Sequence, residues 1–201
     1  MHHFIKLLAW IFVALCALSI AAARPGWTRS HGADSPMPST ESEARWFARM
    51  KPYCNSVEAV TRMHADPPPA STLGLGYGAA CHALAGRIDS ARMMILRAEP
   101  NERFRAASVV FDVGHPVADM GDDRSAGPMM ELVVEFWPNH YMALYHAGAS
   151  EYQLGQFGKA RANLDSFMHV YDSDDGWRQS ARSMLAEING GKTPRTLEVI
   201  P

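Results

Sequence analysis

Histidines are the residues of this chain best suited to chemistry, because imidazole binds metals and titrates near neutral pH. The 201 residues include nine histidines, seven of them after residue 23. None of these seven has the H-x-x-x-H or H-E-x-x-H spacing that places two zinc ligands on one helix face. A zinc site would need side chains from several elements to converge, which the spacing does not predict. We therefore expect solvated or buried histidines and neither a metal nor a cofactor.

Other patterns that could carry chemistry are incomplete. The stretch "AACH" ends like a haem-attachment motif, but Gly78 stands where its first cysteine would be. The acidic run 171–177 lacks the alternating ligands and the final glutamate of a calcium loop, so its aspartates are expected to cap the last helix. The G-x-S-x-G pattern of a serine hydrolase does not occur. The chain is therefore predicted not to be an enzyme.

The first residues predict export. Lys6 precedes a run of apolar or small residues over 7–23 that closes in Ala21-Ala22-Ala23. A weakly cationic start, an apolar core and a small-residue end together make a secretory signal peptide. We expect cleavage after Ala23 and a periplasmic or secreted protein. The alternative is an uncleaved membrane anchor formed by residues 7–23, because 17 such residues are barely enough to span a bilayer.

Charge and cysteine content narrow the possible partners. Residues 24–201 hold 18 basic and 21 acidic side chains and no basic block. Nucleic acid and anionic membrane surfaces are therefore poor candidates, and a membrane would be contacted only through an uncleaved N-terminal segment. Cys54 and Cys81 are the cysteines of this part of the chain. In an oxidising compartment such a pair is more often bridged than free, so we favour a disulfide; two buried free thiols are the alternative.

The rest of the chain divides into a linker, a folded body and a tail. Residues 24–40 are rich in Gly, Pro and Ser and are expected to form a flexible linker. A T-x-x-E capping box that begins at Thr40 predicts the start of the first helix. Two glycines and a proline end the last helix near residue 189. The folded body is therefore expected over 41–189 and a flexible tail over 190–201.

The folded body shows an internal repeat. When Gly86, Gly121 and Gly155 are aligned, with gaps of 35 and 34 residues, five further positions agree in all three units. These positions are Leu75, Val110 and Leu144; Ala79, Gly114 and Gly148; Ala91, Ala126 and Ala160; Ile95, Met130 and Leu164; and Ala98, Val133 and Phe167. A glycine at positive φ allows a tight turn, and the small residues allow two antiparallel helices to approach closely. Each unit is thus a helix hairpin that must stack on its neighbours.

This pattern resembles the tetratricopeptide repeat family, which has a period of 34 residues and often a proline at the end of a unit, as at Pro100 and Pro138. The resemblance implies an all-α solenoid of stacked antiparallel helix hairpins with about eight to nine helices. The implied units are about 41–65, 66–104, 105–138 and 139–172, followed by a capping helix over 173–189. Pro116 departs from the pattern, because it should kink or break the first helix of its unit.

The resemblance also implies a binding surface. In this family the first helix of each unit lines the concave side of the solenoid. The residues placed there are Phe111, His115 and Asp119 of one unit and Met142, Tyr145, Tyr152 and Gln153 of the next. The earlier unit offers only a small apolar stretch. Aromatic side chains would serve as anchors for a partner; the alternative is that they pack in the core.

The function implied is non-catalytic. We expect a scaffold in the cell envelope that binds a protein or peptide partner. Two alternatives stay open: a structural solenoid that self-associates, and an accessory subunit of an envelope enzyme or secretion complex. The expectation of binding rests on the resemblance in fold, and fold alone does not establish function.

Overall fold

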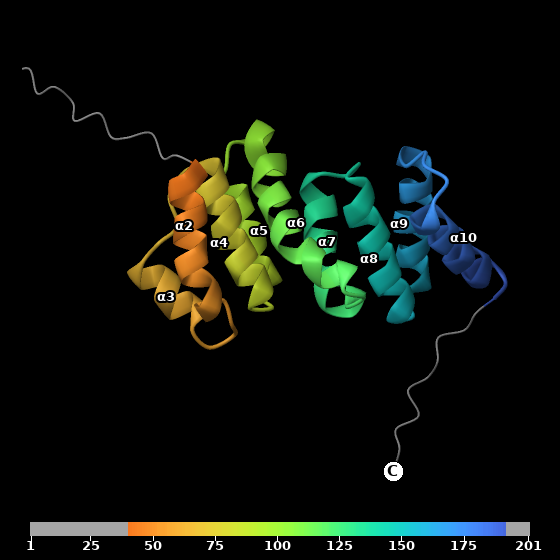
Figure 1. Ribbon diagram of the computed structural model, residues 1–201, viewed down its shortest axis with the longest axis horizontal. Helices are drawn as coiled ribbons and strands as arrows, with labels where there is room; N and C mark the ends of the chain where they lie inside the picture. The colour runs from red at the N-terminus through yellow and green to blue at the C-terminus, as the bar shows by residue number, and fades with distance from the viewer. Residues whose placement is uncertain (1–39, 192–201) are drawn as a thin grey trace, which may run out of the picture. The chain divides into compact units, whose positions relative to one another are not determined.

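The computed structural model describes residues 40–191, shown with coloured helices in Figure 1. The predicted signal peptide or anchor (1–23), the linker up to residue 39 and the tail from residue 192 lie outside this range. Between residues 40 and 191 the chain forms nine α-helices and no strand, which confirms the all-α prediction. The helices are α2 (Thr40–Met50), α3 (Ala59–Ala65), α4 (Thr72–Leu84), α5 (Ile88–Leu96), α6 (Arg103–Asp119), α7 (Asp123–Phe136), α8 (Tyr141–Gln153), α9 (Phe157–Val170) and α10 (Gly176–Asn189).

The helices pack mainly on neighbours in the chain. From α4 to α10 the labels follow one another in chain order in Figure 1. Helix α4 packs on α5 and α6, α6 packs on α7, and α8 lies between α7 and α9. Helix α10 closes the series by packing on α9 and α8. Helix pairs that bury their apolar faces against the next pair should produce this sequential, antiparallel-like packing.

Three turns between helices have the same backbone conformation. Gly86, Gly121 and Gly155 have φ values of 72°, 86° and 73°. In each turn the amide that follows the glycine donates a hydrogen bond to the carbonyl five residues earlier: Arg87 to His82, Asp122 to Val117 and Gln156 to Glu151. This bond pattern satisfies carbonyls at the helix end and requires a residue at positive φ. The prediction that these glycines form tight turns is therefore confirmed.

Small residues permit the close helix contacts. A Cβ atom on Gly148 of α8 would lie 2.7 Å from Cγ of Leu164 in α9. A Cβ atom on Gly114 of α6 would lie 3.0 Å from Cε of Met130 in α7. Leu164 and Met130 are both fully buried. In these two units the small residue seven before the turn glycine therefore faces the large residue nine after it, and the two helices approach closely, as the repeat predicts.

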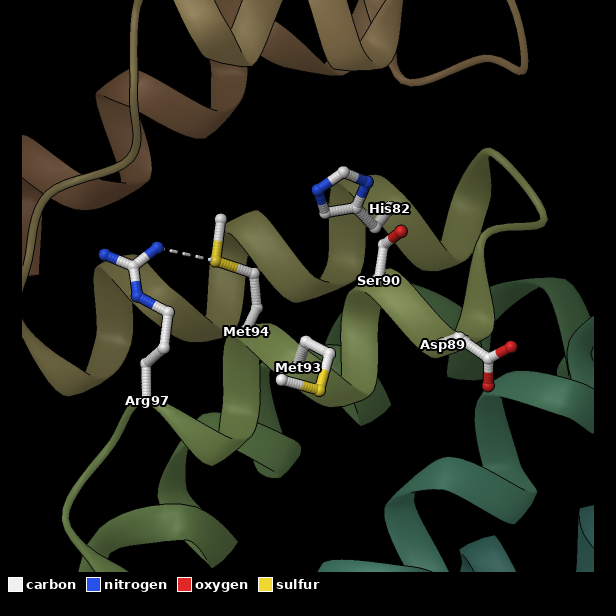
Figure 2. A pocket seen from close by; sticks show the side chains of 6 residues that line it. All are labelled: His82, Asp89, Ser90, Met93, Met94 and Arg97. Carbon is white, nitrogen blue, oxygen red and sulfur yellow. Dashed lines mark hydrogen bonds between the residues drawn. The ribbon is translucent and has the colours of Figure 1, made fainter.

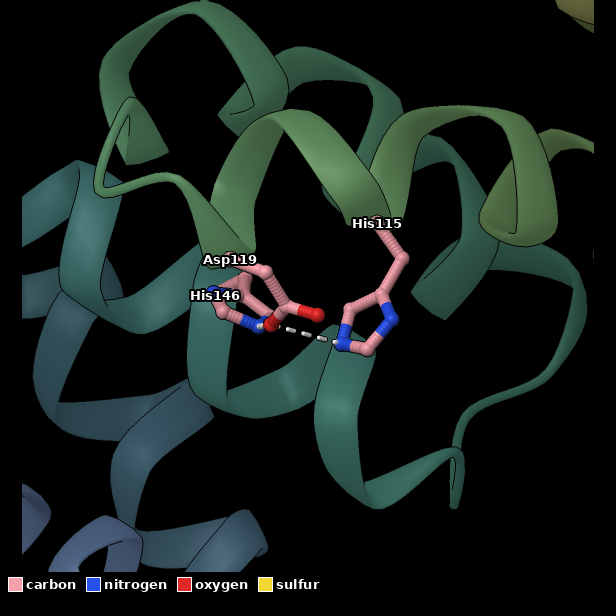
Figure 3. A group of neighbouring side chains, drawn as sticks. All are labelled: His115, Asp119 and His146. Carbon is pink, nitrogen blue, oxygen red and sulfur yellow. Dashed lines mark ion pairs between the residues drawn. The ribbon is translucent and has the colours of Figure 1, made fainter.

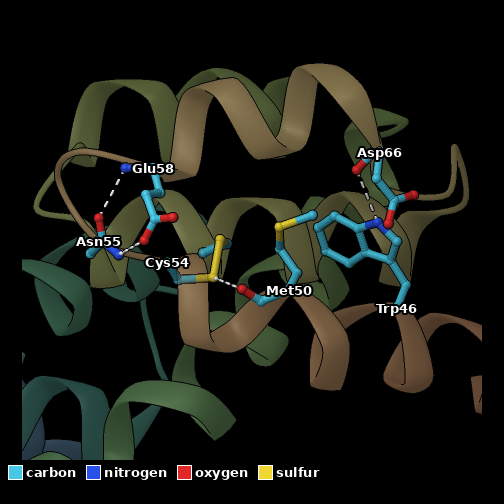
Figure 4. Close-up of a disulfide and its surroundings, with 7 residues drawn as sticks. Trp46, Met50, Cys54, Asn55, Glu58 and Asp66 are labelled. Atoms are coloured by element: carbon cyan, nitrogen blue, oxygen red, sulfur yellow. Dashed lines mark hydrogen bonds between the residues drawn. A yellow bond between two sulfur atoms is a disulfide. The ribbon is translucent and has the colours of Figure 1, made fainter.

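The cysteine pair joins the start of the described domain to α4. Cys54 follows a short 3-10 turn and forms a disulfide with Cys81 in the last turn of α4 (Figure 4). Both residues are buried in the apolar core. Nearby, the indole of Trp46 in α2 donates a hydrogen bond over 3.1 Å to the carbonyl of Asp66, at the end of α3. The hydrogen bond thus joins α2 to the end of α3, and the disulfide joins the segment between these two helices to α4.

Helix α6 continues through Pro116. It runs without interruption from Arg103 to Asp119, so of the two outcomes expected at Pro116 the break is wrong and the kink stays a prediction. A proline at this position removes the bond to the carbonyl of Asp112. Both Asp112 and Pro116 are exposed, so water can reach that carbonyl, while Gly114 and Ala118 on the opposite face are buried against other helices. The lost hydrogen bond is therefore tolerated on the solvent side.

Candidate functional site

The residues predicted to line a groove come from α6 and α8 and differ in exposure. Phe111 and His115 of α6 are half-buried, whereas Asp119 is exposed. Of the α8 residues, Met142 and Tyr145 are buried, Tyr152 is half-buried and Gln153 is exposed. The structure thus leaves only part of the predicted surface open to solvent.

Helix α10 covers two tyrosines of α8, Tyr145 and Tyr152. The hydroxyl of Tyr145 donates a hydrogen bond to Ser180, and its ring centroid lies 4.9 Å from that of Trp177. The hydroxyl of Tyr152 donates to the carboxylate of Glu187. Burial raises the pKa of Tyr145, so its hydroxyl stays protonated at neutral pH. Tyr145 and Tyr152 therefore hold α10 in place, and their contact with a partner stays a prediction.

Two other predicted residues, His115 and Asp119, meet a histidine that the sequence analysis did not select (Figure 3). Nε2 of His115 lies 3.2 Å from Oδ1 of Asp119, and Nε2 of His146 lies 3.7 Å from the same oxygen. The ligand atoms that the three residues offer all lie within 4.8 Å of one another. Two imidazoles and a carboxylate therefore converge between α6 and α8.

Helix geometry explains this convergence. His115 and Asp119 are four residues apart on α6, so they share one face of the helix. His146 lies in the middle of α8 and is 1% exposed. Its Nδ1 is 2.7 Å from Oδ1 of Asp123, the first residue of α7. The amide of Gln153 donates a longer bond, 3.5 Å, to the other oxygen of Asp123. The imidazole of His146 is thus oriented from one side and faces Asp119 on the other.

Burial sets the charge of the neighbouring histidines. It lowers the pKa of His115, with an opposing effect from Asp119 and a smaller lowering effect from His146. Burial also lowers the pKa of His140, the residue that caps α8. Both rings are therefore neutral at neutral pH. A neutral imidazole keeps one nitrogen lone pair, which can accept a hydrogen bond or bind a cation.

Aromatic rings extend from the cluster in a continuous series. The contacts, by distance between ring centroids, are Phe104–Trp137 5.9 Å, Trp137–His140 4.6 Å, His140–Phe111 4.0 Å, Phe111–His115 4.5 Å, His115–His146 5.2 Å and His146–Trp177 5.6 Å. We call these seven residues the aromatic series. Its two ends are open to solvent, since Phe104 is 41% and Trp177 36% exposed. Tyr141, 45% exposed, stacks beside His140.

A separate pocket of about 440 Å³ lies on α4 and α5 (Figure 2). Its lining includes His82, Asp89 and Ser90, residue types that could form a nucleophile and its base. Figure 2 shows the carboxylate of Asp89 turned away from His82. His82 keeps Nδ1 buried without a hydrogen-bond partner in the described structure. Because a catalytic triad needs each residue hydrogen-bonded to the next, this arrangement does not make one.

His146 does not stand out in the sequence, because neither local spacing nor the groove positions of the tetratricopeptide pattern select it. His146 is 31 residues from His115 in the sequence and lies beside a selected residue, Tyr145. Asp123 was missed because it lies at the start of the following helix. The available signal was the spacing of His115 and Asp119, which shows that one face of α6 presents two metal-binding side chains.

Comparison with known proteins found no match: no protein-family model fits the chain, and no curated protein or solved structure is significantly similar to it. Within residues 40–191, none of the helices has both the length and the apolar composition needed to cross a membrane. What is established is an all-helical domain whose helices pack in sequential pairs.

Proposed function

We propose that this chain is a non-catalytic, tetratricopeptide-like scaffold of the cell envelope that binds a protein or peptide partner. The binding surface is formed by α6, the segment between α7 and α8, and the start of α8. It is smaller than the surface that the sequence resemblance implies, because α10 covers Tyr145 and Tyr152 of α8.

The aromatic series is the observation that carries this proposal. A partner gains most from large, rigid side chains that lose little conformational entropy on binding, and aromatic rings supply them. Phe104 and Tyr141 combine wide exposure with a fixed position, since each has a ring contact on the protein side, Phe104 with Trp137 and Tyr141 with Tyr171. Such exposed but ordered rings are typical of contact surfaces.

Helix α4, the first helix of the unit 66–104, gives little support to the self-associating alternative. Self-association would use the small apolar stretch of this helix, which is formed by Leu73, Gly76, Ala80, Ala83 and Leu84. Gly76, Ala80 and Ala83 are buried within the chain itself. A Cβ atom on Gly76 would lie 2.7 Å from the carbonyl oxygen of Ala106 in α6, so α6 already occupies this face. A second copy could not reach it without displacing α6.

Site-specific photo-crosslinking in the cells that make the protein tests the proposal. A photoreactive phenylalanine would replace Phe104 or Tyr141, and in control chains Val57 or Met93. The control residues are 82% and 62% exposed and belong neither to the aromatic series nor to the helix that carries Tyr141. Adducts with one partner from the first two positions only are the expected result, identified by mass spectrometry.

The control positions also define the results that would contradict the proposal. Equal adducts from Val57 and Met93 would mean non-specific contact, and adducts with a second copy alone would favour the self-associating structure. Once a partner is identified, the variant Phe104→Ala/Tyr141→Ala should weaken its binding by about tenfold or more, whereas Val57→Ala/Met93→Ala should not.

A further inference from the structure

The His115, Asp119 and His146 side chains lie close enough together to surround one cation, since the ligand atoms that they offer are all within 4.8 Å of one another. In a tetrahedral zinc site with bonds of about 2.0–2.1 Å, neighbouring ligand atoms are about 3.3 Å apart. The two distances to Oδ1 of Asp119, 3.2 Å from His115 and 3.7 Å from His146, are close to that value. Figure 3 shows both rings directed toward the carboxylate from different helices.

Two of these ligand atoms have no hydrogen-bond partner. Nε2 of His146 and Nε2 of His115 are both buried and make no hydrogen bond among the described residues. The 3.2 Å contact between His115 and Asp119 is an approach of the two atoms without the alignment of a hydrogen bond. Buried polar atoms normally have partners, so two convergent exceptions need an explanation. A cation bound between them would satisfy both.

The orientation of His146 fits the same explanation. A carboxylate can only accept, so the 2.7 Å contact with Asp123 places a proton on Nδ1. Nε2 faces the cluster and is the nitrogen whose lone pair a bound cation would take. A ligand histidine whose other nitrogen donates to a carboxylate is a common arrangement at metal sites, because the carboxylate fixes the ring and increases its basicity.

We propose that His115, Asp119 and His146 form a binding site for a borderline divalent transition-metal cation, with zinc as its representative. Two imidazoles and one carboxylate suit zinc and its neighbours, whereas calcium and magnesium require mainly oxygen ligands. Asp119 is 46% exposed at its side chain, so a cation can reach the site from solvent. Three protein ligands leave at least one coordination position for water or another ligand.

Zinc titration of the whole chain, produced without a polyhistidine tag and stripped by chelator, tests this assignment. We expect one Zn²⁺ per chain by calorimetry and by elemental analysis after dialysis. His115→Gln and Asp119→Asn should each weaken binding at least tenfold. Asp123→Asn should weaken it by about 10–100-fold, because it removes the group that orients His146.

Matched controls separate this site from scattered surface binding. His169→Gln and Asp165→Asn change exposed residues of α9 and should leave the affinity unchanged. Circular dichroism would verify folding, and His115 and Asp119 are exposed enough for their variants to keep the fold. Cobalt bound to the wild-type chain should give the visible absorption of a four- or five-coordinate ion, lost in Asp119→Asn. Absence of one-to-one binding, or equal effects of cluster and control substitutions, would overturn the proposal.

Discussion

Tyr145 of α8 donates a hydrogen bond to Ser180 of α10 over 2.9 Å. This bond, together with the ring contact between Tyr145 and Trp177, holds α10 against α8. Tyr145, which the sequence resemblance places on a partner-binding surface, thus contacts a helix of its own chain instead. The position of α10 therefore determines how much of α8 another molecule can reach.

Removing this hydroxyl should loosen α10 without unfolding the rest. Tyr145→Phe keeps the ring contacts with Phe167 and Trp177 and should lower stability by about 1 kcal/mol, the usual net contribution of one hydrogen bond. Hydrogen exchange of the α10 amides should accelerate, while that of α4 and α6 should not change. Unaltered protection of α10 would show that the bond does not hold this helix.

The close contact of Gly148 with Leu164 predicts intolerance of even one methyl group. Gly148→Ala would place a Cβ atom 2.7 Å from Cγ of Leu164, so α8 and α9 must separate. Overpacking of this kind costs about 1–3 kcal/mol. Gly158→Ala is the matched control, because a Cβ atom there meets nothing within 4 Å. Urea denaturation should show a loss for Gly148→Ala and no loss for Gly158→Ala; a similar response of both would refute the packing argument.

The disulfide should stabilise the first part of the domain. Cys54 and Cys81 are 27 residues apart, and closing a loop of this size contributes about 3–4 kcal/mol in the chain-entropy model. A reducing agent should therefore lower the Tm of the wild-type chain. The variant Cys54→Ser/Cys81→Ser should have the lower Tm from the start and no longer respond to the reductant. If the reductant lowered the Tm of both chains equally, its effect would not come from cleaving this disulfide.

Buried carboxyl groups predict that stability decreases as pH rises. Burial raises the pKa of Glu151 above its usual 4.5, although a hydrogen bond from Asn163 over 2.8 Å opposes the shift. A raised pKa in the folded state means that the folded chain binds the proton more tightly than the unfolded chain. This stabilisation is fully present below pH 4.5 and is lost as pH rises through the folded pKa.

The substitution Glu151→Gln tests that sign. It removes the charge, and its amide oxygen can still accept from Asn163. We expect a flatter dependence of the free energy of unfolding on pH from 4 to 8 and a gain of stability at pH 8. Glu43, whose pKa burial also raises, remains in this variant and accounts for part of the residual slope. A slope identical to that of the wild type would exclude Glu151 as a contributor.

The helical fold could be predicted because it depends on short-range patterns. Gly86, Gly121 and Gly155 mark turns that the backbone can form only with positive φ, and the apolar spacing around them defines the faces that meet. The break expected at Pro116 was wrong for the opposite reason. Its local cost is real, but the contacts of the buried face of α6 maintain the helix, and the local sequence does not show them.

The candidate metal site could be predicted only in part. The sequence shows that His115 and Asp119 lie on the same face of one helix. It does not show which residue of α8 faces them, because that depends on how far α8 is rotated against α6 and α7. The burial of Tyr145 depends in the same way on where α10 packs after the loop that follows α9. Such relations arise from tertiary packing and have no signature in local spacing.

The repeated glycine turns have a consequence for how the domain is assembled. Each helix finds its main packing partners in the next one or two helices, so few contacts require distant parts of the chain to meet. Chains with such low contact order fold rapidly, because the entropy lost in closing each loop is small. A helix pair can therefore form as soon as its successor is available, and the order of folding can follow the order in which the chain emerges.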